Sequence, residues 1–321
     1  MNEIGGYFEL ELAPRQSEPI WHDFVKLNSG RHALEYILQN LQPKASLIYL
    51  PYYTCGVVLE PIVRLGIPYK FYHINENFEI EDLPHLRYGE YIIINNYYGL
   101  KDSYVNNLHK HYKSQMIVDD AQALFHEPLD GMRAFYSPRK FVGVPDGGFA
   151  KTLEPVPNRL DSDSSAERAL HLLLRTDAGA QAGFEEFRKN DEELSKVPMR
   201  FMSNLTYQLL RSIDYKSIRD TRLKNYKYLH ERIGKNNDFQ LRSNDEFACP
   251  MVYPFMTNNC FLREKLIKNK VYVAKYWPDI QSDSLSNFEV ELVNRLLPLP
   301  IDQRYDIGDM ERIVTLINKY A

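Results

Sequence analysis

The sequence predicts an α/β protein with a largely parallel sheet. Short apolar runs alternate with amphipathic helical patterns from about residue 28 onward. This alternation of strand and helix is typical of βαβ crossovers, which make neighbouring strands parallel. At 321 residues the chain can form one large α/β domain and a smaller one, with an extensive buried core.

The amino-terminal half of the expected sheet region begins with a helix. "RHALEYILQNL" (31–41) is amphipathic and follows "NSG", a sequence typical of a helix start, and "CGVVLEPIVRLG" (55–66) is helical and ends at Gly66. Short apolar runs between the helices are expected to be buried strands. In chain order, the expected elements are helix 31–41, strand 46–50, helix 55–66, strand 68–74, strand 90–96 and helix 103–113.

The second half of the expected sheet region lacks long helices until a polar break. Its expected strands are "QMIVDD" (115–120), "MRAFYS" (132–137) and "GFAKTL" (148–153). The polar segment 158–167 marks the end of the sheet region. Beyond it, residues 166–194 are expected to be helical, with Gly179 and Gly183 as weak points.

The last third of the sequence predicts a small α+β domain packed on a long helix. The long helix is expected over 205–234, and it ends at Gly234. The elements that follow are strand 248–255, helix 260–269, strand 271–277 and a terminal helix over 306–320. We therefore predict a large domain over residues 1–200, with an amino-terminal arm over 1–27, and a second domain over 201–321.

Composition and charge exclude several classes of function. Hydrophobic residues make up 44% and charged residues 26% of the chain, which is ordinary for a globular protein. The net charge of −4 argues against a nucleic acid or an anionic membrane as the main partner. Three cysteines without a CxxC pair indicate neither a disulfide framework nor a zinc site, so we expect no metal. Without a signal-like start or a membrane-length apolar run, the expected location is the cytoplasm.

Chemically active side chains follow the expected strands. Asp119 ends one apolar run, and Ser137 and Lys140 follow the next, with Gly147 and Gly148 close behind. Parallel sheets place working residues at the carboxyl ends of their strands, so these groups are expected to meet there. Alone, the lysine could be a solvated surface residue, and "VDDAQ" could be an aspartate-capped turn.

A possible phosphate cradle lies upstream. Ser29 and Gly30 stand at the start of the helix over 31–41, where free backbone N–H groups and the helix dipole bind anions. A plain N-cap explains the same residues when they are taken alone. A lysine amine together with an acidic partner for a pyridinium nitrogen is what pyridoxal phosphate chemistry requires, so the joint pattern favours that cofactor.

The order of these motifs resembles one family over nearly the whole chain. The segments "NSGRHAL", "LPYYTCGVVLEPI", "INNYYGLKD", "IVDDAQAL", "FYSPRKFVGVPDGG", "RLKNYKYL" and "LPLPI" are similar to those of the DegT/DnrJ/EryC1/StrS sugar aminotransferases. The resemblance implies a fold-type I pyridoxal phosphate enzyme, with a three-layer α/β/α large domain, a small carboxy-terminal α+β domain and a homodimeric assembly. It also implies an amino acid donor and a keto acceptor, commonly a nucleotide sugar.

The resemblance assigns a role to each matching residue. Lys140 would bind the cofactor covalently and shuttle protons, and Asp119 would hold the pyridine nitrogen, with Asp120 as the competing choice. Strand alternation sends these two aspartates to opposite faces. The remaining expected contacts are Gln122 along the ring, Ser137, Ser29, Gly30 and Arg31 at the phosphate, Tyr53 or Tyr98 stacked on the ring, and Tyr276 as a substrate contact.

Departures from the family pattern concern the substrate more than the cofactor. Arg31 stands where a threonine is usual, Cys55 where an aromatic residue is common, and Met199 about where an asparagine is expected. Two alternative functions follow. One is a catalytically idle or regulatory relative, and the other is a pyridoxal phosphate-dependent lyase or dehydratase.

Overall fold

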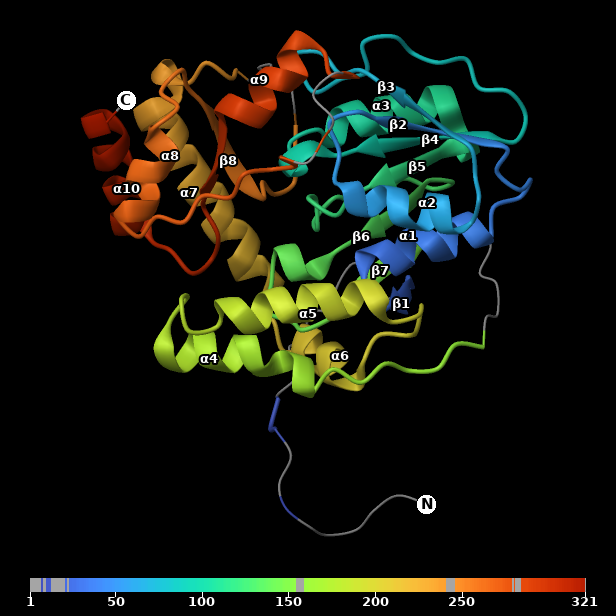
Figure 1. The fold of residues 1–321 in the computed structure, drawn as a ribbon, viewed down its shortest axis with the longest axis horizontal. Helices are drawn as coiled ribbons and strands as arrows, with labels where there is room; N and C mark the ends of the chain where they lie inside the picture. Colours follow the sequence, from blue (N-terminus) through green and yellow to red (C-terminus); the bar gives the residue numbers. More distant parts are fainter. Residues whose placement is uncertain are drawn as a thin grey trace.

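The computed structural model describes residues 7, 10–12, 21, 23–153, 159–240, 246–278, 280 and 284–320. Figure 1 shows a sheet flanked by helices and, beside it, a carboxy-terminal unit built on α7. Within the described ranges, no helix is both long enough and apolar enough to cross a membrane.

A seven-stranded sheet forms the centre of the large unit, in the order β1-β7-β6-β5-β4-β2-β3. The strands are β1 (Val25–Leu27), β2 (Leu47–Pro51), β3 (Tyr69–Tyr72), β4 (Glu90–Asn95), β5 (Met116–Asp119), β6 (Arg133–Tyr136) and β7 (Gly148–Lys151). Neighbouring strands from β3 to β6 are parallel, whereas β7 is antiparallel to both β6 and β1. The predicted largely parallel sheet is confirmed.

Strand alternation divides the apolar side chains between two cores, one on each face of the sheet. Ile93, Ile117 and Phe135 belong to the cluster that includes α1, whereas Ile94 and Val118 belong to the other, which includes α3. Helices thus cover both faces, as the expected three-layer architecture requires. The helices of this unit are α1 (Gly30–Gln39), α2 (Leu59–Arg64), α3 (Asp102–Tyr112), α4 (Leu170–Ala178), α5 (Phe184–Lys196) and α6 (Asn204–Arg211).

The carboxy-terminal unit contains a two-stranded antiparallel sheet of β8 (Val252–Met256) and β9 (Leu296–Pro300). Its helices are α7 (Tyr215–Ile233), α8 (Leu262–Lys268), α9 (Asn287–Arg295) and α10 (Ile307–Tyr320). A third apolar cluster joins α7, α8, α10 and both strands. The cluster on the α3 face also contains residues of α7 and β8, so apolar contacts connect the two units. The boundary at residue 200 remains a prediction.

Two expectations about elements were wrong, and two elements were missed. The helix predicted over 205–234 is two helices, because the Asp214 side chain accepts a hydrogen bond from the Ser217 N–H at 2.9 Å and starts α7 anew. Residues 271–277 form no strand, and Trp277 has a φ of 52°, which is incompatible with extended backbone. Residues 284–305 contain α9 and β9, and no strand or helix was predicted there.

Candidate functional site

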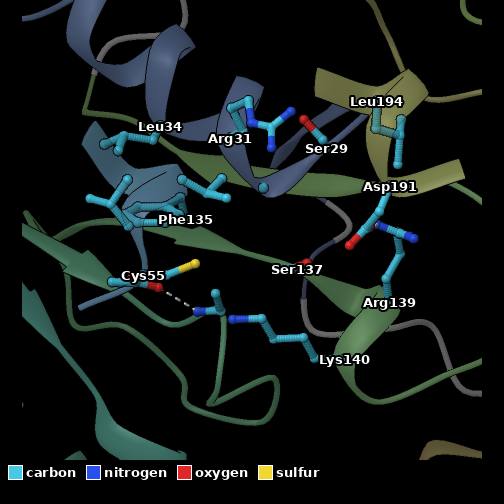
Figure 2. Close-up of a pocket in the computed structure, with 15 residues that line it drawn as sticks. Ser29, Arg31, Leu34, Cys55, Phe135, Ser137, Arg139, Lys140, Asp191 and Leu194 are labelled. Carbon is cyan, nitrogen blue, oxygen red and sulfur yellow. Dashed lines mark hydrogen bonds and ion pairs between the residues drawn. The ribbon is translucent and has the colours of Figure 1, made fainter. Parts of the chain in front are cut away.

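A cavity of about 210 Å³ opens at the carboxyl ends of β5 and β6 and the amino end of α1 (Figure 2). Its lining residues are Ser29, Gly30, Arg31, Leu34, Cys55, Val57, Val58, Asp119, Ala121, Phe135, Ser137, Arg139, Lys140, Asp191 and Leu194. Five of the predicted cofactor residues, together with Lys140, therefore share one cavity. Its volume lies below the ~300–1,000 Å³ of sites for drug-sized ligands, so it suits a small ligand.

The two consecutive aspartates lie on opposite faces of the sheet. Asp119 shares the face of Ile117, lines the cavity, and accepts a hydrogen bond from the Ala121 N–H at 2.9 Å. Asp120 is fully buried on the other face, where its carboxylate is 2.8 Å from His126 Nδ1. The geometry thus brings Asp119, rather than Asp120, to the site.

Burial controls the protonation of Asp119. The residue is only 8% exposed, and burial raises the pKa of its carboxyl to about 6, although the Lys140 charge opposes the shift. At neutral pH the carboxyl is therefore mostly ionised. An ionised carboxylate in this position can accept a hydrogen bond from a cationic ring nitrogen.

Lys140 and Ser137 come from one tight turn that follows β6. Residues Pro138–Lys140 form a single 3₁₀ turn, so Lys140 and Ser137 are held close together at the cavity. The Lys140 side chain is exposed, which leaves its amine accessible to a ligand. The next residue, Phe141, is anchored by its carbonyl, which accepts hydrogen bonds from Gln303 Nε2 at 2.8 Å and Arg222 Nη2 at 3.3 Å.

The paired glycines allow the backbone of β7 to pack against the start of α1. A Cβ on Gly148 would lie 2.2 Å from the Ser29 carbonyl oxygen, so only glycine fits there. The Gly147 N–H also donates to the Asn28 carbonyl at 2.9 Å. These contacts fix the helix start beside the turn that carries Lys140.

The amino end of α1, where the sequence predicted a phosphate cradle, lies at the cavity. Ser29 is the N-cap, and its side-chain oxygen accepts a hydrogen bond from the His32 N–H at 3.1 Å. Gly30 opens the helix so close to Ser137 that a Cβ on it would lie 3.1 Å from the Ser137 Cβ. Free backbone donors, two hydroxyls and the helix dipole therefore converge at one end of the cavity.

Two arginines line the same cavity. Arg31 Nε is 2.7 Å from Glu60 Oε2, and Arg139 Nη1 donates to Asp191 Oδ1 at 2.8 Å. Among the described residues, Arg31 Nη1 and Arg139 Nη2 are buried without any hydrogen-bond partner. Figure 2 shows the Arg31 guanidinium beside Ser29, across the cavity from Lys140.

Three predicted contacts lie outside this cavity. Gln122 is buried and its amide oxygen accepts a hydrogen bond from the Tyr98 N–H at 2.9 Å. Tyr53 is fully buried, and its hydroxyl is 3.1 Å from that of Tyr98, the other residue expected to stack on the ring. Tyr276 stacks on Tyr98 with ring centroids 5.8 Å apart. The tyrosines contact one another in an aromatic cluster, and the roles expected of Gln122, Tyr53 and Tyr276 stay predictions.

Sequence reasoning missed the wall that α5 provides. Asp191 and Leu194 line the cavity, but no residue of the helical segment 166–194 was named as a site residue. Arg139 was not among the predicted site residues. Only its cavity position and its partner Asp191 reveal a second cation at the site. No local sequence signal connects residues 52 positions apart.

Comparison with known proteins shows the fold. No family model and no curated protein matches the chain. Solved structures do, among them a DegT DnrJ EryC1 StrS aminotransferase from Brucella abortus, with 15% identity and a TM-score of 0.63 over 92% of this chain and 85% of that one. The sugar aminotransferase CalS13 from Micromonospora echinospora matches with 15% identity and a TM-score of 0.58 over 92% and 87%.

A third solved structure is Spr1654 from Streptococcus pneumoniae in its PLP-form, with 13% identity and a TM-score of 0.64 over 93% of this chain and 88% of that one. The predicted fold class, and the resemblance as far as it concerns the fold, are confirmed.

Proposed function

We propose that this chain is a pyridoxal phosphate-dependent aminotransferase. Its amino donor is an amino acid, and its acceptor is a keto-sugar nucleotide or a related keto metabolite. The observation that carries the proposal is that Asp119 and Lys140 share one cavity with the amino end of α1. The neighbours' names support the reaction class, since the descriptions of all three name an aminotransferase.

The residues present fit the cofactor. The buried Arg31 Nη1 has no hydrogen-bond partner among the described residues, and it lies in the cavity that Ser29, Gly30 and Ser137 also line. An unpaired buried donor of this kind is costly unless a ligand acceptor meets it. A phosphate bound there would accept from the helix N–H groups, both hydroxyls and the guanidinium.

When bound, pyridoxal phosphate supplies an electron sink for bonds at the α-carbon of an amino acid. Lys140 would offer the amine that holds the cofactor, and the same amine could take up and return a proton at the substrate carbon. The Asp119 carboxylate would accept a hydrogen bond from a protonated ring nitrogen and would keep that proton in place. The α1 end and Arg31 orient the phosphate, which fixes the reacting carbon relative to Lys140.

The site is tested by spectroscopy on Lys140→Ala, with Lys216→Ala as the matched control because Lys216 is exposed on α7. The purified protein and the control should be yellow, and Lys140→Ala should lack the imine absorbance. A wild-type protein that stays colourless after incubation with pyridoxal phosphate contradicts the proposal.

The reaction class is tested separately, by adding amino acids one at a time to the yellow protein. Bleaching of the imine band by at least one amino acid, followed by recovery with a keto compound, is the expected result for an aminotransferase. A band that no amino acid changes favours the idle or regulatory relative. Release of a keto acid or ammonia without a need for an acceptor favours a lyase or dehydratase.

The same proposal includes a keto-sugar nucleotide as acceptor, a homodimeric assembly and a cytoplasmic location. A keto-sugar nucleotide is supported by the description of CalS13 as a sugar aminotransferase. A homodimer and a cytoplasmic location rest on the family resemblance and on the composition. Light scattering of the active protein tests the dimer, since a fully active monomer would contradict it.

A further inference from the structure

Two arginines line the cavity that the amino end of α1 and Ser137 also line. Arg31 has a side chain only 10% exposed, and Arg139 one that is 16% exposed. Both line the cavity, and each has a buried terminal nitrogen without a hydrogen-bond partner among the residues described. Buried polar groups are nearly always paired in native proteins, so two such donors at one site indicate a ligand with several acceptor oxygens.

Each guanidinium has one carboxylate partner, which engages only part of its N–H donors. Arg31 uses Nε for Glu60, and Arg139 uses Nη1 for Asp191. A guanidinium carries five N–H donors, so each of these ion pairs leaves donors that can serve a second anion. Planar forks of this kind match the geometry of phosphate oxygens.

The Arg139 side chain is held in place rather than free to rotate. It leaves the 3₁₀ turn Pro138–Lys140, its Nη1 is tied to Asp191, and its guanidinium carbon lies 5.9 Å from the centre of the Phe187 ring. Helix α5 itself is fixed to the same loop, since Asn190 Nδ2 donates to the Pro145 carbonyl at 2.8 Å. A preorganised guanidinium loses little entropy when it binds a ligand.

We infer that Arg139 is a second phosphate-binding arginine of this site and that Asp191 on α5 is its positioning residue. The ligand class is a phosphate monoester. The inference rests on the proposed function, in which that ester is the phosphate of the cofactor. Arg31 and Arg139, together with Ser29, Gly30 and Ser137, would then bind the phosphate with residues of a single chain.

The test compares ligands that differ only in the phosphate. Dissociation constants are measured by calorimetry for pyridoxal phosphate, pyridoxal and inorganic phosphate. The proteins are wild type, Arg139→Gln, Asp191→Asn, the double variant and the exposed control Lys216→Gln. Arg139→Gln should weaken pyridoxal phosphate roughly 10- to 100-fold, the range expected for a lost hydrogen bond to a charged group, and should leave pyridoxal unchanged.

Asp191→Asn should cause a smaller loss, and the double variant should bind no worse than Arg139→Gln alone, because both changes act on one interaction. Arg139→Lys should restore only part of the affinity, since it keeps the charge without the fork. Equal losses for pyridoxal and pyridoxal phosphate, or no loss for either, would overturn the inference.

The outcomes also separate this inference from the proposed function. A wild-type protein that binds inorganic phosphate through Arg139 but neither form of pyridoxal retains the anion site and contradicts the aminotransferase. A protein that binds pyridoxal phosphate equally well with and without Arg139 retains the aminotransferase and contradicts the role of Arg139.

Discussion

Removing the charge of Asp119 should change how stability depends on pH. Burial raises the pKa of this carboxyl from 3.8 to about 6, so the folded protein without cofactor keeps the proton that the unfolded chain releases earlier. Stability should therefore fall as pH rises from about 4 to about 6, and the whole penalty is present above that window. A shift of about two pKa units corresponds to about 3 kcal/mol at 1.36 kcal/mol per unit. Asp119→Asn removes the ionisable group, so the variant should not lose stability in this way as pH rises.

The measurement is urea denaturation of the cofactor-free wild type and Asp119→Asn at a series of pH values between 4 and 7. The free energy of unfolding of the variant should rise relative to that of the wild type by about 3 kcal/mol across this range. Lys140→Met should widen the window toward higher pH, because the Lys140 charge lowers the Asp119 pKa. A difference between wild type and Asp119→Asn that stays constant with pH would refute the reasoning.

Two further predictions concern packing and the buried ion pair. Gly30→Ala should destabilise the chain by ~1–3 kcal/mol, because the added Cβ would lie 3.1 Å from the Ser137 Cβ. The control Gly56→Ala, where a Cβ would meet nothing within 4 Å, should cause no such loss. Urea denaturation measures both free energies of unfolding, and equal effects would contradict this prediction. His126→Gln should cost about 3–5 kcal/mol near pH 6, because it leaves the buried Asp120 charge unpaired. Burial opposes the His126 charge, but Asp120 raises the His126 pKa to about 9, so the stabilisation by this ion pair is complete below pH 6.5 and is lost as pH rises through 9. The melting temperatures of the wild type and of His126→Gln should therefore converge between pH 6 and 10. Melting temperatures that differ by the same amount at every pH would contradict this prediction.

Local patterns in the sequence predicted the strands and the residues that follow them well. Apolar runs of four to six residues coincide with β2, β4, β5 and β6, because strands buried on both faces need continuous apolar sequence. The break between α6 and α7 was missed, although Ser212 and Asp214 lie there, because the helical periodicity continues on both sides of it. The expected strand over 271–277 failed because tertiary packing overrides β-propensity.

The sequence by itself determined the parallel sheet and the meeting of Asp119, Ser137 and Lys140 with the start of α1. Side-chain alternation along a strand and the parallel order of the strands place these groups at the same edge of the sheet, and both can be read from local sequence. Only the tertiary structure placed Tyr53, Gln122 and Tyr276 outside the cavity. Their positions depend on long-range packing, as with Tyr53 and Tyr98, whose hydroxyls meet across 45 residues of sequence.

The tertiary structure also decided which charged side chains line the cavity. Arg139 and Asp191 are far apart in sequence, and nothing local to either residue predicts their ion pair. The fold brings α5 against the turn that carries Lys140, and the pair then holds a guanidinium at the cavity. A local pattern can place a residue at the end of a strand, but only the packing of distant helices fixes which side chains meet it there.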